Sequence, residues 1–111
     1  METGRSVSYQ DRVALDIEID PRDREDFALG YYPGFIEIDT IDSGQFKDRV
    51  CLTTILERLS DNTYWSFQWS EAIETPGTEG NDYNMDNYMH KIRRVQTGEA
   101  WRVVDWVRVK N

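Results

Sequence analysis

Strict alternation of apolar and polar side chains is the feature that most limits what this chain can fold into. The segment YWSFQWS, residues 64–70, places Trp65, Phe67 and Trp69 on one side and polar residues between them. A period of two is typical of a strand that is buried on one face. This segment therefore predicts a strand whose aromatic face lies in the core.

Three further segments alternate in the same way. Residues 12–20, RVALDIEID, predict a half-buried strand that ends at Pro21, because proline cannot donate to a strand ladder. Residues 35–41 predict a second strand, closed by residues 42–44, and residues 100–110 predict the last one. In the first strand four apolar side chains are expected to face the core, namely Val13, Leu15, Ile17 and Ile19.

Two other segments fit more than one structure. Residues 45–60 carry a helical apolar stripe, but the β-branched run VCLTTIL favours a strand that turns at residues 60–63 and pairs with residues 64–70. Residues 84–97 read either as an amphipathic helix that stops at Gly98 or as a strand over 88–96.

Successive strands without regular intervening helices argue against a parallel sheet. We therefore predict an α+β fold close to all-β, with four to six mainly antiparallel strands and zero to two helices. Residues 21–26 are expected to form a charged turn or a short helix, and residues 30–35 a turn with Pro33-Gly34 in a type II bend.

The chain of 111 residues has the length of one domain, which we place at residues 11–111 after a flexible N-terminus at residues 1–10. No apolar run approaches the roughly 20 residues that span a bilayer, and no secretory signal core is visible. Cys51 is the single cysteine, which points to a reducing compartment. These features predict a cytoplasmic protein without a membrane partner.

Charge is distributed unevenly along the chain, whose formal net charge is −8. Residues 11–42 hold ten acids against three arginines, residues 71–86 hold five acids and no base, and residues 87–111 hold six bases against two acids. Such a field acts on partners and solubility rather than on the fold. The acidity indicates a binding role, although adaptation to a salt-rich environment and internal ion pairs are alternative explanations.

The outward positions of the strand at 12–20 carry a row of carboxylates. Asp16, Glu18 and Asp20 are expected about 6.6 Å apart, from roughly 3.3 Å per residue. Glu37 and Asp39 extend the row on a second strand. Such a row can imitate a phosphate backbone or cover a basic active site; a solvated sheet face is the alternative.

We therefore expect a small acidic protein that binds and inhibits a protein partner with a basic surface, such as a nuclease, a toxin or a nucleic-acid-handling enzyme. The carboxylates would steer the partner, and exposed aromatic rings would anchor it. The candidate anchors are the exposed members of a set of four, Tyr31, Tyr32, Trp65 and Trp69.

Two other functions stay open. A small-molecule or enzymatic pocket in a curved antiparallel sheet would be lined by Trp65, Phe67, Trp69 and Trp101. A structural or assembly subunit would add strand edges to a neighbour. Enzymatic activity is the less expected outcome, since no residue set in the sequence specifies a reaction; we expect no catalytic residue and no cofactor.

Metal and nucleophile motifs are incomplete. Asp82, Asn84 and Asp86 resemble the opening of a calcium loop, but Asn87 and Arg93 stand where that loop needs glycine and a bidentate glutamate. Cys51 and His90 are the only soft ligands, and the apolar neighbours of Cys51 argue against a reactive Cys–His pair. We expect no metal site.

The last quarter of the chain has material for nucleic-acid binding, because cations lie near Trp101 and Trp106. A net charge of −8 repels a polyanion, so we expect these cations to pair with acids of the same chain and predict no direct nucleic-acid binding. The cations are Lys91, Arg93, Arg94, Arg102, Arg108 and Lys110.

The tail at residues 98–110, GEAWRVVDWVRVK, resembles the closing strand of NTF2-like domains. The resemblance covers 13 residues and implies a curved sheet around a conical pocket. NTF2-like folds begin with long helices, and the strand-like segments at 12–20 and 35–41 depart from that pattern.

Overall fold

The computed structural model describes residues 9–74, 80–97 and 103–110, and in these ranges the protein is mostly antiparallel sheet with one short α-helix. The predicted fold class, α+β and close to all-β, is confirmed. In chain order the elements are β1 (Asp16–Glu18), the 3₁₀ helix η1 (Pro21–Asp23), α2 (Arg24–Leu29), β2 (Phe35–Phe46), β3 (Arg49–Arg58), β4 (Thr63–Ala72), β5 (Asn81–Asp82), β6 (Tyr88–Thr97) and β7 (Val103–Arg108).

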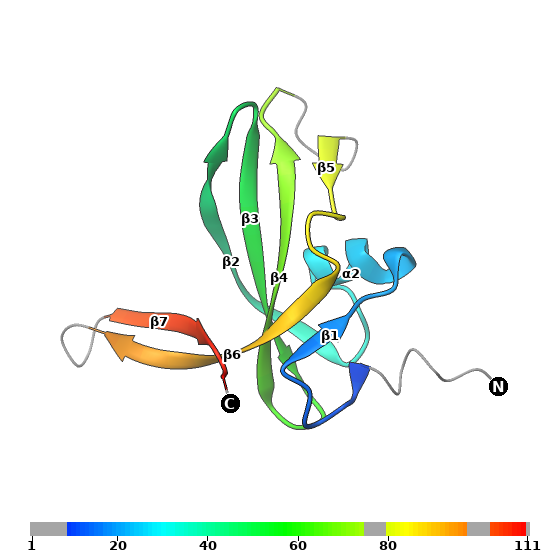
Figure 1. Ribbon diagram of the computed structural model, residues 1–111, viewed down its shortest axis with the longest axis vertical. Coiled ribbons are helices and arrows are strands. Elements are labelled where there is room, and N and C mark those ends of the chain that lie inside the picture. Colours follow the sequence, from blue (N-terminus) through cyan, green and yellow to red (C-terminus); the bar gives the residue numbers. More distant parts are fainter. Residues whose placement is uncertain (1–8, 75–79, 98–102, 111) are drawn as a thin grey trace.

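Seven strands within the described ranges form one sheet in the order β1-β6-β4-β3-β2 (Figure 1). β5 adds to β4 near one end, while β7 adds to β6. β6 pairs with β4 only from His90 to Ile92, opposite Tyr64–Ser66. Beyond Ile92, the strand β6 pairs only with β7 among the described strands.

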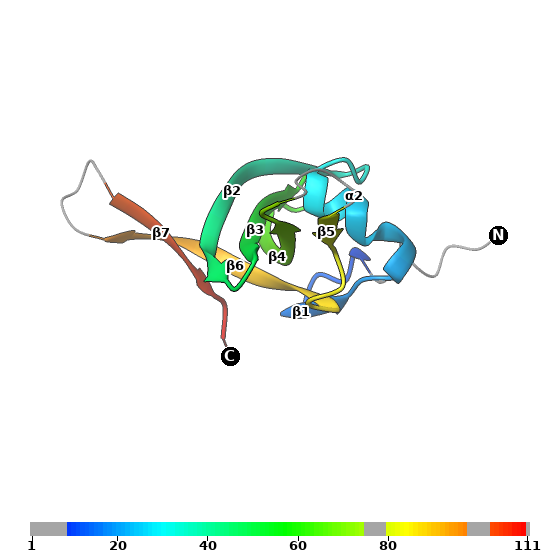
Figure 2. The same cartoon turned by 90° about the horizontal axis from the view of Figure 1, so that it is seen from above.

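The outer part of β6 and β7 therefore leaves the body of the sheet as a two-stranded ribbon, residues 93–97 and 103–107, which we call the arm. Figures 1 and 2 show the arm extending away from the side of the molecule where α2 lies. Figure 2 also shows that β2, β3 and β4 curve across one side of the molecule while β6 crosses beneath them.

The two faces of the sheet differ in what covers them. On β4 the side chains of Trp65, Phe67 and Trp69 point to one face, which we call the core face, and pack against α2 and the N-terminal segment. Ser66 and Gln68 point to the other face, called the open face. The predicted aromatic strand is thus confirmed, because Trp65, Phe67 and Trp69 share one face of β4 and are buried in the core.

Helix α2 is short, and its position follows from its ends. Asp20 caps η1 by accepting a hydrogen bond from the Arg22 amide, and Gly30 closes α2 with a left-handed φ of 79°. Phe27 then stacks on Tyr32 with ring centroids 4.4 Å apart and meets Phe35 edge-on. This aromatic cluster fixes α2 over the core face.

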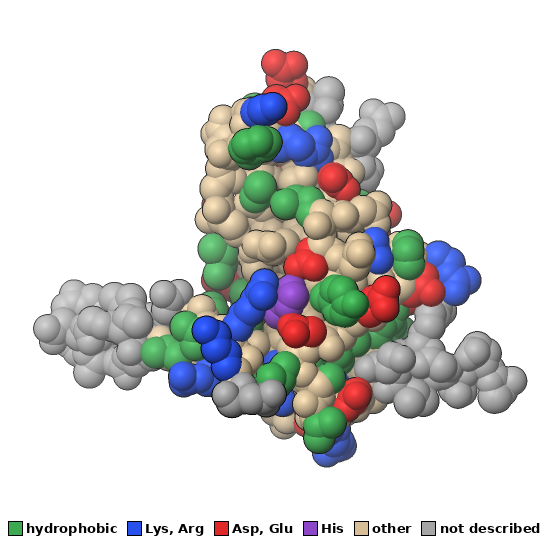
Figure 3. All heavy atoms as spheres, viewed as in Figure 1, with side chains coloured by type: hydrophobic (Ala, Val, Ile, Leu, Met, Phe, Trp, Pro, Cys, Tyr) green, Lys and Arg blue, Asp and Glu red, His purple; other side chains and the backbone are tan. Residues whose placement is uncertain are grey.

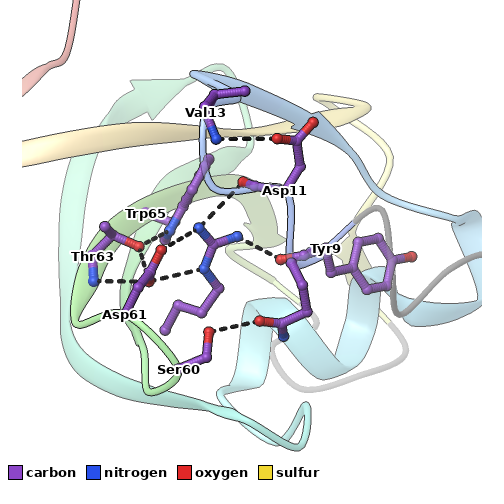
Figure 4. Close-up of polar contacts among 9 residues, drawn as sticks. Tyr9, Asp11, Val13, Ser60, Asp61, Thr63 and Trp65 are labelled. Carbon is purple, nitrogen blue, oxygen red and sulfur yellow. Dashed lines mark hydrogen bonds and ion pairs between the residues drawn. The ribbon is translucent and has the colours of Figure 1, made fainter.

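Buried Arg58 at the end of β3 joins the N-terminal segment to the sheet. Its guanidinium donates to both carboxylate oxygens of Asp61 at 3.0 and 2.7 Å, and to the backbone oxygens of Tyr9 and Asp11 at 2.6 and 3.3 Å. It also lies 4.9 Å from the ring centroid of Trp65. Figure 4 shows Tyr9, Asp11 and Asp61 converging on this cation.

Three sequence expectations need correction. Val13 is 86% exposed instead of facing the core, because β1 pairs only over Asp16–Glu18 and Val13 lies in a turn where its amide donates to Asp11. Residues 42–44 do not close β2, which runs on to Phe46 through a bulge there. Tyr9, expected in a flexible N-terminus, is buried in the core.

The two segments that the sequence left open between helix and strand are both strands. Residues 49–58 form β3, which pairs with β4 across the turn predicted at residues 60–63, and residues 88–97 form β6 rather than a helix. The long helices of an NTF2-like cone are not found among the described residues, where α2 spans six residues. No helix in these ranges has the length and apolar character to cross a membrane.

Candidate functional site: an acidic hollow beside β1

A hollow of about 430 Å³ lies along β1, at one edge of the sheet. Ile17 and Ile19 alternate inward and anchor this edge in the core, which leaves the polar residues between them toward solvent. The carboxylates that line the hollow are those of Asp11, Asp16, Glu18 and Asp20. The three acids predicted as a row on this segment therefore line one surface.

The four acidic residues differ in how many hydrogen bonds and ion pairs their carboxylates form within the protein. Asp11 accepts the Val13 amide, and Asp20 accepts the Arg22 amide and an ion pair from the exposed Arg22 guanidinium at 3.2 Å. The exposed side chain of Glu18 has no hydrogen bond or ion pair with any residue that the structure describes. Glu18 is therefore the carboxylate most available to an incoming cation.

Tyr9 forms the inner wall of the hollow. Its hydroxyl donates to Asp23 at 2.7 Å and accepts the Asp20 amide at 2.9 Å. Burial, reinforced by the hydrogen bond to Asp23, raises the pKa of the Tyr9 phenol well above its ordinary value. The phenol is therefore a neutral structural donor that holds the end of β1 against η1.

His90 links β1 to the loop before β6. Its Nδ1 lies 2.6 Å from Asp16 Oδ1 and its Nε2 lies 2.6 Å from Asp86 Oδ2. Figure 3 shows the histidine between two acidic side chains on this face, with basic side chains over β6 and β7 beside it. Two carboxylates occupy both ring nitrogens, so His90 positions Asp16 at the hollow and has no free nitrogen for proton transfer.

Glu37 and Asp39 do not extend the acidic row. They lie on β2, at the opposite edge of the sheet from β1. A bulge between them also places Glu37 opposite Leu56 and Asp39 opposite Ile55, so the two carboxylates leave different faces. Glu37 accepts a hydrogen bond from the Thr40 hydroxyl and Asp39 from the Thr40 amide.

Of the four predicted aromatic anchors, Tyr31 is available, with 74% of its surface exposed. Trp65 and Trp69 lie on the core face, and Tyr32 is packed between Phe27 and Phe35. The pocket expected from Trp65, Phe67 and Trp69 is wrong for the same reason, because these rings fill the core; Trp101 lies outside the described residues.

The residues of the calcium-loop-like segment and of the Cys51–His90 pair do not form a site in the structure. Asp82 and Asp86 each accept the amide two residues ahead, in local turns. Cys51 pairs with Ser70 on β4 and His90 with Ser66, which separates them by roughly 13 Å of strand. Within the described ranges, no three His, Cys, Asp or Glu side chains form a group that could hold a metal ion.

A second hollow, of about 190 Å³, lies on the open face and was not anticipated from the sequence. It lies where β7 and β6 approach β3 and β4, and its lining includes Ile55, Ser66, Gln68, Ile92, Trp106 and Arg108. We call it the open-face groove. These residues come from β3, β4, β6 and β7, and the path of β6 across the sheet brings them together.

Comparison with known proteins finds no matching family model, no matching curated protein and no matching solved structure. The function of this chain is therefore argued from its own geometry. The two hollows differ in the chemistry they offer: four carboxylates along β1, and an arginine beside a tryptophan on the open face.

Proposed function

We propose that this protein is a binding domain that docks onto a basic protein partner through the acidic hollow beside β1. The observation that supports this most directly is that four acidic residues line one hollow in a chain of net charge −8. A lysine or arginine of the partner entering the hollow would meet Asp11, Asp16 and Glu18. No chemical step is needed for this role.

Electrostatics would act in two stages. The net negative field accelerates encounter with a positively charged surface, an effect that salt screens over about 8–10 Å. At contact, the Glu18 carboxylate accepts a charge-assisted hydrogen bond without losing an internal partner, since its side chain has none among the described residues. Asp16, held by His90, is already oriented and loses little side-chain freedom on binding.

An apolar contact can accompany the charges. Val13 is 86% exposed and precedes Ala14, which lines the hollow. An exposed β-branched side chain at the rim excludes water around ion pairs and so strengthens them. The partner class proposed here is a nuclease, a toxin or another nucleic-acid-handling enzyme, because such proteins present basic surfaces that a row of carboxylates can occupy in place of phosphates.

Charge reversal at one free carboxylate tests the proposal. Glu18→Lys changes the hollow, while Glu25→Lys makes the same change on exposed α2, outside its lining. We expect a hexalysine peptide titrated into ¹⁵N-labelled protein to shift the amides of residues 11–20. Its affinity should fall at least tenfold in Glu18→Lys, and clearly less in Glu25→Lys.

A capture experiment extends the test to the natural partner. Wild-type protein and both variants are used as bait in lysate at low and high salt. A basic protein held by wild type and Glu25→Lys, but lost from Glu18→Lys and at high salt, is the expected result. Equal capture by Glu18→Lys and wild type, together with peptide shifts outside residues 11–20, would contradict the proposal.

A further inference from the structure

The floor of the open-face groove is withdrawn from water although it lies on the side of the sheet away from the core. Ile55 is 1% exposed and Ile92 5% exposed, yet neither belongs to the core cluster around Trp65. They lie where β6 meets β4, and Trp106 and Arg108 of β7 line the same groove. The groove therefore offers an apolar floor to a ligand that enters from the open face.

One wall of the groove is an ordered aromatic ring. Trp106 lies 5.0 Å from Tyr64 between ring centroids, and the Arg94 guanidinium lies 5.2 Å from Trp106 and 5.6 Å from Tyr64. The cation thus contacts both rings, which fixes the orientation of Trp106. A ring with a fixed orientation binds a planar ligand with little entropic cost.

The one charged side chain in the described lining of the groove is Arg108, which only donates. Arg108 stands opposite Ile92 in the register of β6 and β7 and lines the groove. Among the described residues, the side chains of Arg108 and Gln68 form no hydrogen bond, and Arg108 forms no ion pair, although the chain has 21 acids. An arginine left without a carboxylate in so acidic a chain is available for a carboxylate from elsewhere.

We propose that the open-face groove binds a small aromatic carboxylate. The ring would lie over Ile55 and Ile92 against Trp106, and the carboxylate would accept a bidentate pair of hydrogen bonds from Arg108. The Gln68 amide lies in the same lining and supplies a further donor. This site shares no lining residue with the acidic hollow, so it goes beyond the proposed docking function.

Size and charge select this occupant. A volume of about 190 Å³ is below the roughly 300–1,000 Å³ of drug-sized ligand sites, so it suits a single ring. Arginine beside tryptophan also suits single-stranded nucleic acid, but a net charge of −8 opposes a polyanion far more than a monoanion. Binding of an oligonucleotide instead is an outcome that the test distinguishes.

The first measurement is a titration of the full chain with 4-fluorobenzoate, followed by ¹⁹F NMR and by the amide shifts of ¹⁵N-labelled protein. We expect saturable shifts at Gln68, Ile92 and Arg108 and none at residues 16–18. The neutral isostere 4-fluorobenzamide should bind at least tenfold more weakly, because it lacks the charge that Arg108 recognises.

Variants separate the groove from general attraction to cations. Arg108→Gln should weaken 4-fluorobenzoate binding at least tenfold, whereas Lys110→Gln, which removes the same charge outside the lining, should change it less than twofold. Trp106→Leu serves as a second variant that keeps every charge, and should also weaken binding. Unfolding curves confirm that each variant is folded.

Three results would overturn the proposal. The first is equal binding of the benzoate and the benzamide, and the second is equal binding by Arg108→Gln and Lys110→Gln. The third is tight binding of a hexathymidylate that the Arg108 substitution abolishes while the benzoate gives no saturable shift. Loss of hexalysine binding in Glu18→Lys is independent of all three, so the two proposals fail separately.

Discussion

Arginine serves opposite purposes on the two faces of the sheet. Arg58, buried at the end of β3, gives its donors to Asp61 and to two backbone oxygens, and it lies on the ring of Trp65. Arg108 lies on the open face beside Trp106 and has no carboxylate partner among the described residues. Each arginine has a tryptophan nearby, but the side chain of Arg58 is fully engaged inside the protein, whereas that of Arg108 is exposed in a groove whose described lining holds no acidic residue.

The difference teaches how to separate structural cations from candidate binding cations. A buried guanidinium must have its donors satisfied, since an unsatisfied charge in the interior costs several kcal/mol. An exposed guanidinium is satisfied by water and can exchange that water for a ligand. Arg58 is therefore structural, because it is buried and each nitrogen of its guanidinium donates a hydrogen bond inside the protein. Arg108 is available to a ligand, because it lines the groove and its side chain has no internal partner among the described residues.

The largest loss of stability is expected when the buried arginine, Arg58, is replaced. Arg58→Met leaves Asp61 Oδ2 and the backbone oxygens of Tyr9 and Asp11 without a donor, although Thr63 still donates to Asp61 Oδ1. We expect the free energy of unfolding to fall by about 3–5 kcal/mol, the usual cost of breaking a buried ion pair from one side. Urea unfolding followed by tryptophan fluorescence measures it.

Arg108→Gln is the matched control, because it removes the same charge from the open face. We expect it to change the free energy of unfolding by less than about 0.5 kcal/mol, as is usual for exposed positions. Similar losses in both variants would mean that Arg108 is also structural, and the contrast between the faces would not hold.

A second contrast uses apolar residues on β3 and β2. Leu56 is fully buried on the core face, whereas Ile36 on β2 is 43% exposed. Leu56→Ala should cost about 2–5 kcal/mol, the range for a buried leucine whose removal leaves a cavity. Ile36→Ala should cost less than about 1 kcal/mol, because its side chain is only partly removed from water. The same urea titration compares them, and equal costs would place Ile36 in an unrecognised core.

The strands were predictable where one face is buried and the other is wet. Trp65, Phe67 and Trp69 alternate with polar residues because one face of β4 carries the aromatic core and the other carries small or polar side chains. β6 was ambiguous because its apolar residues, Met89 and Ile92, lie on opposite faces. A strand that contributes to both faces loses the period-two signal.

The candidate site was predictable only in part. The carboxylates beside β1 follow from local alternation, so their shared surface could be inferred from adjacent residues. The distance between Glu37 and this surface could not be inferred, because it depends on which strands pair. β1 and β2 lie at opposite edges of the sheet. The groove around Arg108 depends on contacts between strands far apart in the sequence, for which no short pattern exists.

Acid should weaken the Arg58 cluster in a defined direction. Hydrogen bonds from Arg58, and further ones from Thr63, hold the pKa of Asp61 well below its ordinary value. The folded state therefore favours the carboxylate, and this stabilisation is present above the unfolded pKa of about 3.9 and is lost as the pH falls toward the folded pKa. Asp61→Asn should be less stable than wild type at pH 7 by about 1–3 kcal/mol.

The stability difference between wild type and Asp61→Asn should shrink steadily below about pH 4, because protonation removes the same charge from the wild type. Urea midpoints measured from pH 7 to pH 2 give both curves. Parallel curves would show that Asp61 contributes no pH-dependent stabilisation. Arg58 would then stabilise the fold mainly through its hydrogen bonds to the backbone oxygens of Tyr9 and Asp11.

The last comparison concerns local opening of the arm rather than global unfolding. Amides at Arg93 and Val95 belong to a ribbon in which β6 pairs only with β7 among the described strands, whereas Trp65 on β4 lies between β3 and β6. A two-stranded ribbon alone is marginally stable, so hydrogen exchange of the arm should be faster than that of β4 by orders of magnitude under native conditions.

Trp106→Leu removes the contacts with Arg94 and Tyr64 and should accelerate arm exchange further, by severalfold, while β4 keeps its protection. If the arm and β4 exchange at the same rate in wild type, the arm is stabilised as strongly as the core, and the open face is then as rigid as the packed one.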